Sequence, residues 1–168
     1  AAIESRATAA QLRVAATVRD AWWQWQRARI EVGTARDQLD NTRLIAAVSD
    51  GAGGAIVTWS DSRSGGGVSF DLYAHRVLAS GALDPAWPGN GLLVAAAAND
   101  QSFPMVVSDD AGGAVIAWQD GRAGNNDIYA HRVLAAGTVD SNWPTHGLVV
   151  CAATNSQERP QLTTDGSG

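Results

Sequence analysis

The fold is decided by the stretch VSDGAGGAIVTWSDSR at Val48–Arg63, which returns as VSDDAGGAVIAWQDGR at Val107–Arg122, 59 residues later. A second stretch, DLYAHRVLASG at Asp71–Gly81, returns as DIYAHRVLAAG at Asp127–Gly137, 56 residues later. The difference of three residues falls in the Gly-rich segment 65–69, where an insertion disturbs little. The chain therefore contains an internal repeat, and each copy must be one supersecondary unit.

Each copy predicts four short strands separated by turn residues. The Asp-x-Ala-Gly-Gly links favour a tight hairpin between the first two strands. Four antiparallel strands in a unit of this length are typical of one β-propeller blade. The predicted strands are Leu44–Val48, Ala55–Ser60, Asp71–Ala79 and Leu92–Ala97 in the first copy, and Phe103–Ser108, Ala114–Gln119, Asp127–Ala135 and Leu148–Ala152 in the second.

The repeat resembles the blades of secreted bacterial β-propeller proteins, whose pattern is SDGxGGAIVAWxDxR…DIYAxRV…G…W…G. This resemblance covers residues 44–168 and implies a mainly β fold of bacterial, extracytoplasmic origin. The first residues of the chain lack the basic-then-apolar order of a signal peptide, so the location stays open.

Residues 1–43 predict a different element, an amphipathic helix. Ala, Arg, Gln, Glu and Leu dominate, Pro is absent, and apolar residues recur at the spacing of a coiled-coil seam with one stutter. This segment resembles the long periplasmic helices of TolC-type outer-membrane efflux proteins. The membrane strands of that family are missing, so a channel function is not implied.

The expected organisation is a helix at 1–43, one blade at 44–100, a second at 101–157 and the start of a third at 158–168. Two blades and a fraction cannot close a ring, which takes about four to eight. An open blade also exposes an apolar face and a strand edge. We therefore expect a cyclic homo-oligomer, a trimer or a tetramer, in which Arg159–Thr164 completes a neighbour's first blade. The abrupt junction at Asn41–Leu44 suggests a fusion or a fragment.

Composition excludes several classes of protein. The 168 residues are 45% hydrophobic, and no run of about 20 apolar residues predicts a membrane-spanning helix. The net charge is −5 and no basic cluster occurs, so a nucleic-acid partner is not expected. The single cysteine, Cys151, excludes an internal disulfide and, with three histidines, a zinc module.

Two sets of residues are candidate sites. Trp87 and Trp143 stand beside Pro in a loop, where an aromatic ring can stack on a sugar or pack between blades. The second set is formed by Asp and His on the third strand of each copy. Within one strand they lie about 13 Å apart, too far for one metal ion, so only groups from different blades or chains could hold a divalent ion together. These residues are Asp71, His75, Asp127 and His131.

The leading expectation for function is a self-assembling partial β-propeller that acts as a binding or structural module, without catalysis and without a cofactor. The sequence contains no G-x-S-x-G, P-loop or dinucleotide-binding motif. The alternative is a metal-assisted or promiscuous hydrolase, whose site forms from the repeated Asp and His at a subunit interface or in a central channel.

Overall fold

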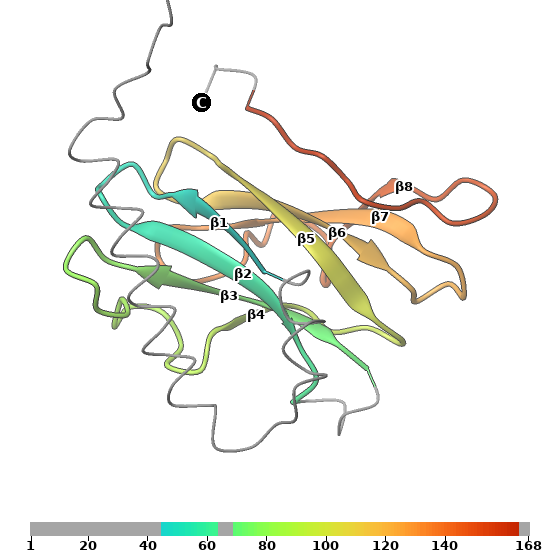
Figure 1. Ribbon diagram of the computed structural model, residues 1–168, viewed down its shortest axis with the longest axis horizontal. Coiled ribbons are helices and arrows are strands. Elements are labelled where there is room, and N and C mark those ends of the chain that lie inside the picture. Colours follow the sequence, from blue (N-terminus) through green and yellow to red (C-terminus); the bar gives the residue numbers. More distant parts are fainter. Residues whose placement is uncertain (1–44, 64–68, 165–168) are drawn as a thin grey trace, which may run out of the picture.

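The computed structural model describes residues 45–63 and 69–164, and this part of the chain is mainly β. Eight strands form two four-stranded antiparallel sheets, each with its strands in sequence order (Figure 1). Sheet 1 contains β1 (Ile45–Ser49), β2 (Ala55–Asp61), β3 (Asp71–Val77) and β4 (Leu92–Ala95), and sheet 2 contains β5 (Gln101–Ser108), β6 (Ala114–Asp120), β7 (Asp127–Val133) and β8 (Leu148–Cys151).

All eight predicted strands are present, which confirms the predicted β architecture at this level. The predicted helix at 1–43 lies outside the described residues. Within residues 45–63 and 69–164, no helix has the length and apolar character needed to cross a membrane.

The two sheets share their hydrogen-bonding registers. In sheet 1, Trp59 pairs with Tyr73, and in sheet 2 Trp118 pairs with Tyr129. Both sheets also shift register at the same place, within the pairing of the third strand with the fourth. Positions that match in the sequence therefore match in the sheets, and an environment in sheet 1 can be compared with its counterpart in sheet 2.

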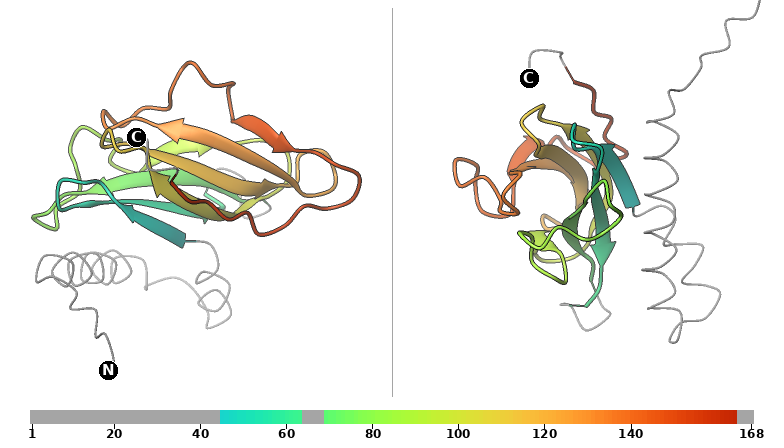
Figure 2. Two further views of the ribbon diagram at one scale, coloured as in Figure 1. Left: turned by 90° about the horizontal axis from the view of Figure 1, so that it is seen from above. Right: turned by 90° about the vertical axis from the view of Figure 1, so that its left-hand side faces the viewer.

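Sheet 2 packs on sheet 1 through β5, which lies against β1, β2 and β3. Figure 2 shows this stack from two further sides. A single apolar cluster spans both sheets, because apolar side chains on alternate strand positions meet between them. It contains Ile56, Leu72, Ala74, Trp87, Val94 and Ala95 from sheet 1, and Val106, Ala114, Ile116, Trp118 and Val133 from sheet 2.

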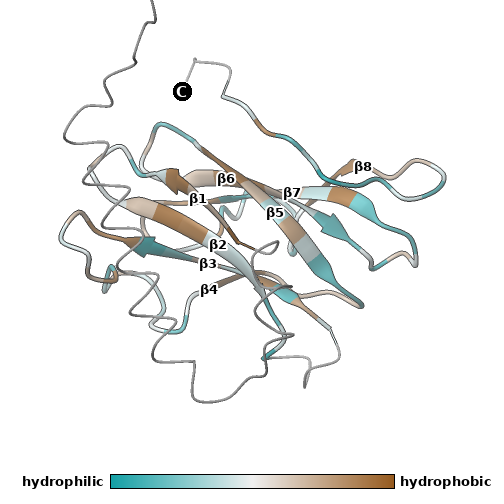
Figure 3. Ribbon diagram, in the orientation of Figure 1, coloured by the Kyte–Doolittle hydropathy of each residue, from teal (hydrophilic) through white to brown (hydrophobic). Residues whose placement is uncertain are grey.

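The covered face of sheet 1 carries Ile56, Leu72 and Val94, which belong to the shared cluster. The open face of sheet 2 carries the counterparts of these residues, Val115, Ile128 and Val150. In Figure 3 apolar colouring marks segments of β2, β5 and β8, so apolar residues occur inside the stack and also on β8.

Candidate functional site

An ion pair ties the first hairpin of sheet 1 to β3. The Asp50 carboxylate accepts hydrogen bonds from the backbone N–H groups of Ala52 and Gly54, both at 2.8 Å. Its other oxygen accepts from Arg76 Nε, also at 2.8 Å. Arg76 in turn lies 3.5 Å from Asp84 in the following loop. The turn, the strand and the loop are therefore held together by charge-assisted contacts.

Sheet 2 contains the same network. Asp109 accepts from Ala111 and Gly113 and pairs with Arg132, whose Nη2 lies 2.7 Å away. Burial alone would raise the pKa of Asp109, but the hydrogen bonds from Arg132 and the backbone outweigh it, so the pKa is lowered. The network repeats with the fold, and we assign it a structural role.

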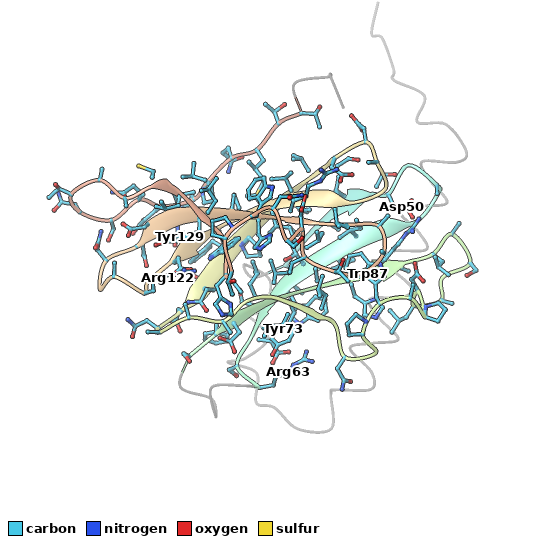
Figure 4. The ribbon with its side chains drawn as sticks, turned by 180° about the vertical axis from the view of Figure 1, so that it is seen from behind. Asp50, Arg63, Tyr73, Trp87, Arg122 and Tyr129 are labelled. Atoms are coloured by element: carbon cyan, nitrogen blue, oxygen red, sulfur yellow. The ribbon has the colours of Figure 1, made fainter. Side chains whose placement is uncertain are left out.

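A second cluster stands at the other end of each sheet, where Figure 4 places Arg63 beside Tyr73 and Arg122 beside Tyr129. The Arg122 guanidinium lies 3.9 Å from the Tyr129 ring centre and forms a bidentate pair with Asp120, whose carboxylate also accepts from Trp118 Nε1 at 2.8 Å. In sheet 1 the Arg63 guanidinium lies 4.4 Å from the Tyr73 ring centre. The arginines are therefore engaged in contacts within their own sheets.

Trp87 is part of the contact between the sheets. Its side chain is 3% exposed, its ring stacks on His75 at a centroid distance of 6.0 Å, and its Nε1 donates to the Ala135 carbonyl of sheet 2 at 3.2 Å. A ring this buried has no free face for a sugar. Trp87 packs between sheets, which was one of the two roles that the sequence left open.

Trp143, the counterpart of Trp87 in sheet 2, has a different environment. It stacks on His131 at 6.0 Å in the same way, but it is only half-buried. In the part of the chain that the structure describes, its Nε1 has no hydrogen-bond partner. Stacking of Trp143 on a sugar stays a prediction.

The structure disperses the residues predicted to hold a metal ion. His75 and His131 each face a tryptophan, and each places its Nδ1 about 3 Å from the backbone carbonyl of the next residue. Asp71 lies opposite Asp61, and Asp127 lies opposite Asp120 and accepts from Asn125. Among residues 45–63 and 69–164, no three His, Cys, Asp or Glu side chains gather as metal ligands would.

Burial also affects the chemistry of His131. Desolvation lowers the pKa of this imidazole, because the charged form loses its contact with water, and the backbone carbonyl of Arg132 opposes the shift only in part. His131 is 2% exposed and is therefore held neutral between the two sheets.

One contact between the sheets was not predicted from the sequence. The backbone N–H of Ala96, just after β4, donates to His146 Nδ1 of the β7–β8 loop at 3.1 Å. The position that matches His146 in sheet 1 is Asn90, so the repeat gave no signal for an imidazole here.

Comparisons of the chain with protein-family models, with curated proteins and with solved structures found no match.

Proposed function

We propose that this chain is a self-assembling β module, whose sheets stack on the sheets of further copies as blades of a β-propeller do, and that it serves as a binding or structural unit without catalysis. One observation carries the proposal. The open face of sheet 2 is exposed to solvent, whereas the matching face of sheet 1 is covered by sheet 2.

The exposed fractions of matching residues show the difference. Val94 of the covered face is 2% exposed, whereas its counterpart Val150 is 61% exposed. Ile56 and Leu72 are fully buried, whereas their counterparts Val115 and Ile128 are half-buried. The open face is therefore built like a buried surface although no sheet covers it, which is the usual mark of an interaction site.

The inner surface of sheet 2 suggests what the cover is. Trp118, His131 and Val133 face the covered face of sheet 1, and the same residue types stand at the matching positions Trp59, His75 and Val77. Sheet 1 of a second copy therefore carries the residue types that suit the open face. Because Trp59, His75 and Val77 are 8%, 5% and 7% exposed in the single chain, docking requires this face of sheet 1 to be uncovered. Repetition of this contact generates a ring or a filament, and a trimer or tetramer would contain six or eight blades.

The test is the mass of the protein in solution, measured by light scattering after size exclusion. We expect a multimer at micromolar concentration. Val150→Asp places a charge on the open face and should give monomers, because burying an unpaired carboxylate is costly. A stable monomer of the wild-type protein would overturn the proposal.

Val149→Asp is the matched control. Val149 is 47% exposed, and its counterpart Leu93 is 40% exposed even though sheet 2 is stacked on sheet 1. Residue 149 should therefore stay in water after assembly, and the Val149→Asp variant should keep the wild-type mass. Stoichiometric metal in the purified protein, lost together with a hydrolytic activity on chelation, would favour the metal-assisted hydrolase instead.

A further inference from the structure

We propose that Trp143 joins one copy to the next by docking on the loop at Ala79–Leu83 of a second copy. This inference rests on the proposed assembly and names the contact that fixes its geometry. Trp87 makes the equivalent contact inside the chain.

The contact of Trp87 is a close fit between a loop of sheet 1 and a loop of sheet 2. Its Nε1 donates to the Ala135 carbonyl at 3.2 Å. A Cβ added to Gly137 would lie 2.9 Å from the Trp87 Cα and Cδ1 atoms, so only glycine permits this approach. Val139 of the same loop packs against the shared apolar cluster. Sheet 2 therefore presents a site for tryptophan formed by Ala135, Gly137 and Val139.

Sheet 1 carries the matching loop, and no tryptophan among the described residues is seated on it. The counterparts of Ala135, Gly137 and Val139 are Ala79, Gly81 and Leu83. Gly81 has a φ of 85° and Gly137 has a φ of 77°, so the two loops share this backbone conformation. Ala79 is exposed and Leu83 is 47% exposed, which leaves the site accessible.

The missing tryptophan is available in the β7–β8 loop of sheet 2. Trp143 matches Trp87, keeps the same stacking on histidine, and is half-buried with its Nε1 unbonded among the described residues. Among residues 45–63 and 69–164, one such loop therefore holds a tryptophan, its counterpart holds none, and one tryptophan has no such loop against it. If sheet 1 of a second copy stacks on sheet 2 of the first copy, in the way that the two sheets of one chain stack, Trp143 of the first copy meets the loop at Ala79–Leu83 of the second.

A second pair of groups supports the same placement. Inside the chain, Ala96 N–H donates to His146 of the next sheet. The counterparts are Ala152, which is exposed, and Asn90, which is also exposed and whose side-chain oxygen can accept a hydrogen bond. In the assembly, Ala152 of one copy therefore faces Asn90 of the next.

The contact is head to tail, because Trp143 and its site are different surfaces. Two variants test it, one on each surface. Trp143→Ala removes the ring, and Leu83→Arg blocks the site with a charge. Each should weaken self-association about thirtyfold or more in sedimentation analysis, as loss of a buried interface tryptophan usually does.

Leu93→Arg is the matched control for Leu83→Arg. Both leucines are exposed in the single chain, at 40% and 47%. The counterpart of Leu93, Val149, remains 47% exposed beside sheet 1, whereas the counterpart of Leu83 packs into the core. Leu93→Arg should therefore assemble like the wild-type protein.

Mixing the two defective variants tests the direction of the contact. The Leu83→Arg copy retains Trp143, and the Trp143→Ala copy retains the site, so an equimolar mixture should form a dimer and nothing larger. If both variants assemble like the wild-type protein, the tryptophan contact is wrong while the proposed assembly stands. If the wild-type protein is itself monomeric, both proposals fail. Defective variants that do not restore each other would indicate a symmetric contact and would also overturn the inference.

Discussion

At the scale of single residues, Asp109 and Asp110 are neighbours with opposite environments. The Asp109 side chain is 6% exposed and pairs with Arg132, whereas Asp110 is exposed on the turn with a φ of 54°. Asp109→Asn removes the carboxylate charge that forms the ion pair with Arg132, and we expect a loss of about 2 kcal/mol in the free energy of unfolding. Asp110→Asn should change it by less than about 0.5 kcal/mol. Urea unfolding measures both, and equal midpoints would contradict a structural role for the ion pair.

The pH dependence of stability has a defined sign at His131. Its pKa in the folded state lies below the ordinary value of 6.5, because burial disfavours the imidazolium. As the pH falls below about 6.5, the unfolded chain therefore binds a proton before the folded chain does. The contribution of His131 is complete above that pH and decreases between it and the lowered pKa.

Urea unfolding at several pH values tests this dependence. In the wild-type protein, the free energy of unfolding should fall as the pH is lowered from 7.5 toward the lowered pKa. His131→Asn removes the titrating group and should flatten the slope in this range. If the slope is unchanged in the variant, another group is responsible.

At the scale of the elements, Gly147 fixes the loop before β8 against Trp118. Its φ is 102°, and a Cβ placed there would clash with the Trp118 Cη2 atom. Gly147→Ala should therefore cost the strain of a left-handed residue, about 1–2 kcal/mol, and a further ~1–3 kcal/mol for displacing a fully buried ring.

Gly124→Ala separates these two costs. Gly124 has a φ of 96° with no atom within 4 Å of the added Cβ, so this variant suffers the backbone strain alone. In urea unfolding, Gly147→Ala should lose more stability than Gly124→Ala. Equal losses would mean that the Trp118 ring moves aside without a measurable loss of stability.

The strands were predictable because the repeat shows the same alternation of apolar residues twice. Their ends were less predictable, since contacts distant in sequence decide them. β4 was predicted to reach Ala97 but ends at Ala95, because Ala96 donates to His146 of the other sheet. β5 begins at Gln101 rather than Phe103, since a φ of 51° at Phe103 forms an irregularity inside a longer strand.

The candidate sites were less predictable than the strands. The Asp–Arg networks occur in both copies because their residues recur in the repeat, but matching residues cannot reveal which copy is covered. Trp87 and Trp143 are equivalent in sequence, and only the stacking of the sheets makes one a buried contact and the other half-buried.

At the scale of the whole molecule, the segment after β8 is placed against sheet 2 as β5 is placed against sheet 1. Gln157 N–H donates to Asn126 O, as Gln101 N–H donates to Phe70 O at the start of β5. Arg159 has a φ of 54°, close to that of its counterpart Phe103. Residues 157–164 therefore leave sheet 2 as β5 leaves sheet 1, and they are directed along the open face.

This placement changes the role expected for Arg159–Thr164. Sheet 1 already contains its first strand, because β1 pairs with β2 from Ile45 to Ser49. In a second copy docked on the open face, β1 would occupy the place of this segment. The segment can complete a neighbour's first blade only by displacing β1, and it pairs with no strand in its own chain as far as Thr164.

We expect β1 to remain paired with β2, and residues 157–164 to leave the open face when a second copy docks there. The hairpin of β1 with β2 is local in sequence, so its closure costs little entropy. Within 158–164, only Pro160 and Leu162 are even half-buried, so little apolar contact is lost when the segment leaves the open face.

Deleting residues 158–168 should then strengthen assembly a few-fold, seen as a lower dissociation constant in sedimentation velocity. Hydrogen exchange at Gln161–Thr163 should be fast in the assembled wild-type protein. Weaker assembly after the deletion, together with protection of these amides, would instead establish that the segment exchanges with β1 and clasps the neighbouring copy.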